Sequence, residues 1–150
     1  MKLSTARRGN ARRSAFTLLE VLVVVAILVI LASVASVATF KYLEDARKSK
    51  AQLQAKTIAT ACEAFYTSTS NTQGTYPGSV NELIAPYWGG TGFLKDPQQD
   101  SVDPWNQPFQ INNQFSTDGN QSQSCLVFTH SPKDNEPISQ FGRGPASRVQ

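Results

Sequence analysis

The chain has 150 residues and a formal net charge of +3 at neutral pH. Five of its 14 basic residues lie within the first 15, so residues 16–150 carry nine basic and 11 acidic residues and a net charge of −2. The basic balance of the whole chain is therefore no evidence for nucleic-acid binding, and no nucleic-acid partner is expected. The length left after the N-terminal segments suffices for about one small domain.

A basic segment, residues 1–15, precedes an apolar run that extends to Phe40. Residues 21–38 contain no charged side chain, and a run of that length is long enough for a helix to cross a bilayer. The basic flank should keep the N-terminus in the cytoplasm. Glu20 lies inside the run, where a carboxylate is costly and usually functional. This carboxylate therefore needs a partner.

Residues 15–20, AFTLLE, resemble the processing site of the type IV pilin family, in which a prepilin peptidase removes a basic leader before a phenylalanine. The resemblance implies cleavage between Ala15 and Phe16 and N-methylation of the new Phe16 amino terminus. It also implies that Glu20 pairs with the Phe16 amino group of a neighbouring subunit. The family more often has glycine in place of Ala15. Opposite charges attract strongly in a low-dielectric medium, so this pair would set the register between subunits.

An ordinary signal peptide or a plain membrane anchor is the alternative for the same region, because both begin with a basic stretch before an apolar run. Residues 36–38, SVA, look like a signal-peptidase site. Cleavage there would release a secreted binding domain that recognises a ligand through Trp88 and Trp105. The apolar run exceeds the roughly 7–15 residues of a signal sequence, and an acid inside it is unfavourable there. We therefore favour the pilin-like interpretation, with residues 16–40 as a transmembrane and assembly helix.

Residues 41–72 should continue this helix as an amphipathic segment that enters the head. They contain no proline or glycine. Apolar residues recur in them at helical spacing, at Ala51, Ala55, Ile58, Cys62 and Phe65. This stripe predicts the helix face that packs on a sheet. Glu44 and Lys48 stand four residues apart, which predicts a pair on the helix surface.

Residues 73–140 should form a small head with an antiparallel β-sheet, because proline and glycine are scattered among short β-like runs at 109–111 and 125–129. The chain is thus predicted to be α+β and pilin-like, with the long helix packed on that sheet. Residues 141–150 have little apolar content, which predicts a mobile tail.

The motifs of the head occur in an order that resembles the major pseudopilins of type II secretion systems. The most specific of them is the Asp-Pro-Trp block at residues 103–105, and it follows Tyr76-Pro77 and the segments 80–84 and 93–96. Trp105 and Phe109 are expected to anchor the core or a loop.

Heads of that family usually end in an acidic loop that binds calcium, so the resemblance implies a calcium ion as a cofactor. The ligands it implies are the side chains of Asp134, Asn135 and Glu136, with Asp134 and Glu136 foremost, and the carbonyls of Thr129 and Ser131. Calcium takes roughly 6–8 oxygen ligands, of which these residues supply several. The loop is shorter and less acidic than the family pattern, with Lys133 where an acid is expected. A solvated polar turn is the alternative.

The chain has two cysteines, Cys62 on the apolar stripe and Cys125 at the start of a β-like run. A disulfide between them is predicted if the head lies outside the cytoplasm, and two buried unpaired thiols are the alternative. The cysteines and the single histidine, His130, lack the spacing of a metal site and the base and orienting group that a nucleophile needs. The chain is therefore not expected to be an enzyme.

The predicted function is that of a structural subunit of a periplasmic pseudopilus, which drives protein export through a type II secretion system. The partners that the resemblance implies are further copies of the chain, minor pseudopilins, the prepilin peptidase, the inner-membrane platform protein and its cytoplasmic ATPase. It implies a single-pass protein of the bacterial inner membrane, with its N-terminus cytoplasmic and its head periplasmic. A type IV pilus subunit, used for adhesion, twitching or DNA uptake, is the alternative within filaments.

Overall fold

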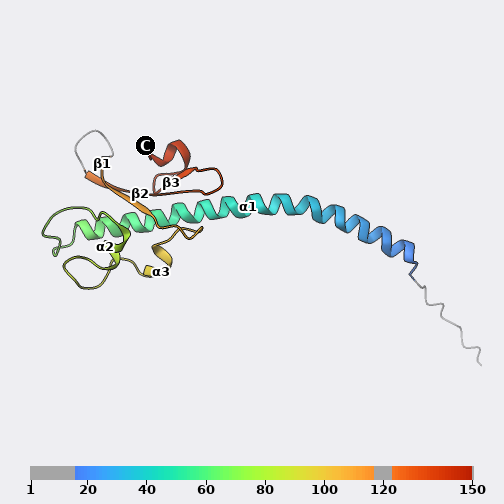
Figure 1. Cartoon of the computed structure of the whole chain (residues 1–150), viewed down its shortest axis with the longest axis horizontal. Helices are drawn as coiled ribbons and strands as arrows, with labels where there is room; N and C mark the ends of the chain where they lie inside the picture. The colour runs from blue at the N-terminus through green and yellow to red at the C-terminus, as the bar shows by residue number, and fades with distance from the viewer. Residues whose placement is uncertain (1–15, 117–122, 150) are drawn as a thin grey trace, which may run out of the picture. The chain divides into compact units, whose positions relative to one another are not determined.

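The computed structural model describes residues 16–116 and 123–149. The chain divides into two compact units, with the boundary between Lys41 and Tyr42. The elements that the structure describes follow the order α1 (Leu18–Tyr66), α2 (Val80–Ile84), α3 (Pro97–Asp100), β1 (Gln110–Ser116), β2 (Gln123–His130), β3 (Pro137–Ser139) and the 3-10 helix η1 (Gly144–Ser147) (Figure 1). A long N-terminal helix followed by a small antiparallel sheet confirms the predicted α+β class.

The helix α1 continues across the boundary between the units, and it contains no proline or glycine that would interrupt it. It ends at Tyr66, before the predicted limit at residue 72. The side-chain amide of Asn71 donates hydrogen bonds to the carbonyls of Phe65, at 3.3 Å, and Thr75, at 2.9 Å. The last turn of a helix leaves carbonyls without an intrahelical partner. Asn71 donates to one of these carbonyls, that of Phe65, and so favours the end of α1 at this point.

In the described part of the chain, three antiparallel strands form one sheet in the order β1-β2-β3. Val127 of β2 lies opposite Ile111 of β1, and the register between these strands shifts between Asn112 and Phe115. Both predicted β-like runs overlap strands, namely β1 and β2. The strand β3 was not predicted, because three residues that begin with a proline carry almost no strand signal.

The core of the second unit lies between α1 and the sheet. Ile58, Cys62 and Phe65 of α1 and Cys125 and Val127 of β2 are buried and belong to one cluster. Ala55 and Ala61 of α1 also belong to the cluster, and its remaining buried members come from other segments: Tyr76, Val80, Leu83, Leu94 and Phe109. The predicted apolar stripe of α1 is therefore confirmed as its packing face.

Residues 141–149 pack beside β3, and the mobility of the tail 141–150 stays a prediction. The hydroxyl of Ser139 donates to the carbonyl of Ser147 at 2.6 Å, and Ser147 is fully buried. The guanidinium of Arg148 lies 4.7 Å from the centre of the Phe141 ring, within the range of a cation–π contact. Polar contacts thus join this segment to the sheet despite its low apolar content.

Candidate functional site

The first turn of α1 contains the residues predicted to direct processing and assembly. Phe16 precedes the helix and Glu20 lies in its first turn, whereas Ala15, on the other side of the predicted cleavage, lies outside the described residues. The backbone N–H of Glu20 donates to the hydroxyl oxygen of Thr17 at 3.3 Å, so Thr17 caps the helix. Sequence reasoning missed this role, although a threonine three residues before a glutamate is the signal of a capping box.

The apolar side chains that the structure describes in the first unit are exposed. Leu18 is 83% exposed and Phe16 is 77% exposed. Among the described residues α1 is the one helix long and apolar enough to cross a membrane, with a window of mean hydropathy 3.1 of which nothing is buried. Contiguous apolar surface of this extent marks contact with a membrane or with other proteins. By length and composition, the segment has the properties of a membrane anchor.

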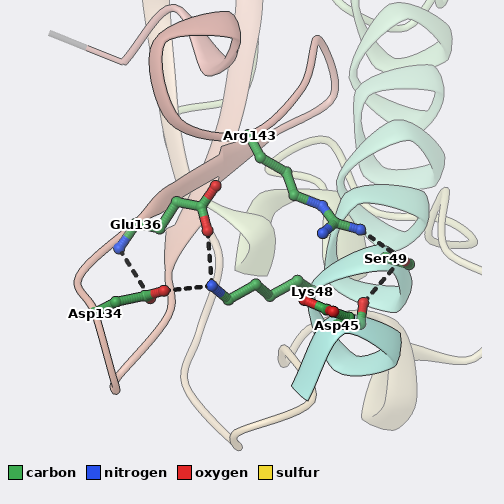
Figure 2. Close-up of polar contacts among 6 residues, drawn as sticks. All are labelled: Asp45, Lys48, Ser49, Asp134, Glu136 and Arg143. Carbon is green, nitrogen blue, oxygen red and sulfur yellow. Dashed lines mark hydrogen bonds and ion pairs between the residues drawn. The ribbon is translucent and has the colours of Figure 1, made fainter. Parts of the chain in front are cut away.

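In the second unit, an ion-pair cluster joins α1 to the loop between β2 and β3 (Figure 2). The ammonium nitrogen of Lys48 donates to Asp134 Oδ2 and to Glu136 Oε2, the latter at 2.7 Å. Lys48 is only 7% exposed, although its partners remain partly open to solvent. These two hydrogen bonds raise the pKa of Lys48. The same contact lowers the pKa of Asp134 to about 2.

This geometry does not fit the predicted calcium site. The carboxylates of Asp134 and Glu136 both face a positive charge that the chain itself supplies. The carbonyl of Ser131 accepts from the N–H of Asn135 at 2.9 Å. Thr129 lies within the β2–β3 pairing. Among the residues that the structure describes, no three His, Cys, Asp or Glu side chains gather where they could hold a metal ion. No step of the proposed function is therefore assigned to calcium.

Lys48 is the residue of this cluster that sequence reasoning missed, because it was assigned to a surface pair with Glu44. That assignment is wrong, since Lys48 is buried against the β2–β3 loop and Glu44 lies 3.9 Å from Arg47 instead. A signal was present in the chain. Lys48 precedes Ala51 by three residues and so continues the helical spacing of the buried stripe toward the N-terminus.

The Asp-Pro-Trp block, residues 103–105, connects a loop of the head to the sheet by hydrogen bonds. Asp103 is 4% exposed, and its carboxylate accepts from the backbone N–H groups of Trp105, at 2.9 Å, and Gln107, at 2.8 Å. Its other oxygen accepts from the Thr129 hydroxyl at 2.6 Å. The carboxylate thus ties the loop before β1 to β2. Phe109 is buried in the core, as predicted.

The two cysteines lie together in the core. Cys62 and Cys125 are both buried and both free thiols. The neighbouring Cys125 thiol, together with burial, raises the pKa of Cys62. The structure therefore brings the predicted disulfide partners into contact without a bond between them. His130 is the last residue of β2, and its ring packs edge-on against Phe128 at 5.8 Å between centres.

Comparison with known proteins identifies one similarity. Residues 10–36 match a family model described as the prokaryotic N-terminal methylation motif. The matched range contains Phe16, Glu20 and much of the exposed apolar segment, and it ends before the second unit begins. No curated protein and no solved structure matches the chain. The N-terminus is therefore similar to that of type IV pilin-like proteins, which are processed before a phenylalanine and assemble into filaments.

Proposed function

We propose that the chain is a structural subunit of a filament that assembles from the inner membrane, and specifically a pseudopilin of a type II secretion system. One observation supports the proposal above all: the methylation motif at residues 10–36 overlaps an exposed apolar helical segment whose first turn contains Glu20. A soluble domain does not normally leave so much contiguous apolar surface uncovered. Membrane lipid would cover it before assembly, and neighbouring subunits would cover it afterwards.

The charges of the first turn would determine how the subunits dock. Cleavage before Phe16 creates an α-amino group at the start of the helical segment, and Glu20 of an adjacent copy is the partner that we assign to it. Burying either charge alone is costly, whereas the pair attracts strongly in a low-dielectric medium. Apolar packing is non-directional and favours many registers. The charge pair would therefore select one register among them.

The order of motifs in the head supports a pseudopilin over a pilus subunit. The proposed partners are copies of the chain, minor pseudopilins, the prepilin peptidase and an inner-membrane platform protein with its cytoplasmic ATPase. Residues 1–150 contain no phosphate-binding glycine motif, so the energy for assembly is assigned to that ATPase. The head would lie in the periplasm, because the basic segment before the apolar run favours a cytoplasmic N-terminus.

The test of processing is the intact mass and N-terminal sequence of the protein from its native membrane. We expect the mature chain to begin at N-methylated Phe16. A start at Thr39 would identify an ordinary signal peptide and a secreted domain. An uncut Met1 would identify a plain membrane anchor. Either of these results would overturn the proposal.

The test of assembly is Glu20→Ala, with Glu44→Ala as the matched control that removes the same charge from the same helix. We expect Glu20→Ala to reach the membrane but to form no fibre, and protein export to fail with it. Glu44→Ala should assemble normally. Normal fibres in Glu20→Ala would refute the role of the charge pair. Fibres outside the cell together with unchanged export would identify a pilus subunit instead.

A further inference from the structure

The loop between β2 and β3, residues 131–136, is shaped around a positive charge. The N–H of Ser131 donates to the carbonyl of Glu136 at 3.0 Å, and the N–H of Asn135 donates to the carbonyl of Ser131 at 2.9 Å, so the loop closes on itself. The N–H of Glu136 also donates to Asp134 Oδ1 at 3.4 Å. One oxygen of each acid, Asp134 Oδ2 and Glu136 Oε2, contacts the same point. Two carboxylates this close repel one another unless a cation lies between them.

The cation at that point is the ammonium group of Lys48, which α1 supplies across 86 and 88 residues of sequence (Figure 2). One residue further along the helix, the Ser49 hydroxyl oxygen accepts from the guanidinium of Arg143, which follows β3. The same hydroxyl donates to the carbonyl of Asp45 at 2.9 Å. A single turn of α1 therefore holds the segments on both sides of β3 by polar contacts.

A divalent ion and Lys48 cannot occupy this point together, because their like charges would repel at contact distance. The ammonium donates three hydrogen bonds at most, and its two carboxylate contacts already use two of them. A calcium ion would need roughly 6–8 oxygen ligands. The carbonyl of Ser131, one of the candidate ligands, already accepts a hydrogen bond from within the loop.

We infer that Lys48 is a built-in cation that replaces a metal ion in this head, so that the β2–β3 loop closes without calcium. The ammonium neutralises one of the two carboxylate charges that face it, and it is fixed to α1 by covalent bonds. A metal ion is lost on dilution or chelation, whereas this cation is not. The loop is therefore independent of the calcium concentration around the head.

The first test uses the full-length protein in detergent micelles, with thermal unfolding followed by tryptophan fluorescence in EDTA and in millimolar calcium chloride. We expect the same midpoint in both solutions and no heat of calcium binding by titration calorimetry. A midpoint that rises with calcium and falls with EDTA would overturn the inference. This comparison needs no variant, so it remains decisive even if a substitution prevents folding.

The second test compares Lys48→Met with Lys50→Met, which removes the same charge from an exposed position two residues away. Loss of the buried cation leaves the loop carboxylates unpaired, so we expect Lys48→Met to lower the midpoint by about 5 °C or more. Amide hydrogen exchange in residues 131–136 should accelerate in this variant alone. Equal behaviour of the two variants would show that Lys48 does not hold the loop.

Discussion

Replacing Phe65 with alanine would remove the largest fully buried side chain among the described residues of the head. Phe65 is 1% exposed. Its ring centre lies 4.6 Å from that of Trp88, 5.6 Å from that of Phe93 and 6.5 Å from that of Tyr87. The substitution would therefore delete one member of several aromatic contacts and leave a cavity between α1 and the loop that follows α2.

The expected loss of stability follows from the burial of the Phe65 side chain. Phe→Ala changes in well-packed cores destabilise by about 3–5 kcal/mol, and the loss of aromatic pairs places Phe65 in the upper part of that range. Domains of this size have only about 5–15 kcal/mol of total stability. A change of that size corresponds to a fall of roughly 15 °C or more in the unfolding midpoint.

The assay is thermal unfolding of the full-length protein in detergent micelles, read from tryptophan fluorescence, because Trp88 packs directly on Phe65. Leu53→Ala is the matched control, since Leu53 lies on the same helix but is 66% exposed. We expect its midpoint to change by no more than a few degrees. Equal shifts in Phe65→Ala and Leu53→Ala would refute the assignment of this face of α1 to the core.

Two further predictions concern backbone packing and acid stability. Gly92→Ala should destabilise the head by about 1–3 kcal/mol, because the added Cβ would lie 2.5 Å from the carbonyl oxygen of Ile84. The measurement is the midpoint of thermal unfolding. Gly78→Ala is the control, because a Cβ at residue 78 makes only ordinary van der Waals contacts. The Lys48 contact lowers the pKa of Asp134 to about 2, below the value of about 3.9 for an unfolded chain. The contribution of this carboxylate to the free energy of unfolding is therefore present above about pH 4 and is lost as the pH falls toward 2. Asp134→Asn should flatten that part of the stability profile in acid unfolding, and an unchanged profile would argue against the ion pair.

The local features of α1 were predictable because each is encoded by residues close together in the chain. The length of the apolar run, the absence of proline and glycine, and the stripe that ends at Phe65 all act within a few helical turns. The pairing of Cys62 with Cys125 in space also followed from the pattern, because each lies on the apolar face of its own element. No pattern in the sequence, however, indicates whether these two thiols form a disulfide or stay reduced.

The cluster around Lys48 was not predictable from local pattern, because its contacts join residues more than 80 positions apart. Taken alone, a lysine four residues after Glu44 on a helix indicates a solvated surface pair. The position of β3 and the course of residues 141–149 likewise depend on contacts that only the folded head creates, such as that between Ser139 and Ser147.

The sequence by itself determined the processing motif, the anchor helix and the apolar face that builds the core, since charge and periodicity along the chain are sufficient for these. Tertiary structure alone decided which charge fills the loop after β2. The loop carboxylates could bind a metal ion, a lysine or water, and the choice depends on what the fold brings to them. Packing α1 on the sheet places the Lys48 ammonium between Asp134 and Glu136, and a buried ammonium is stable only where such partners surround it.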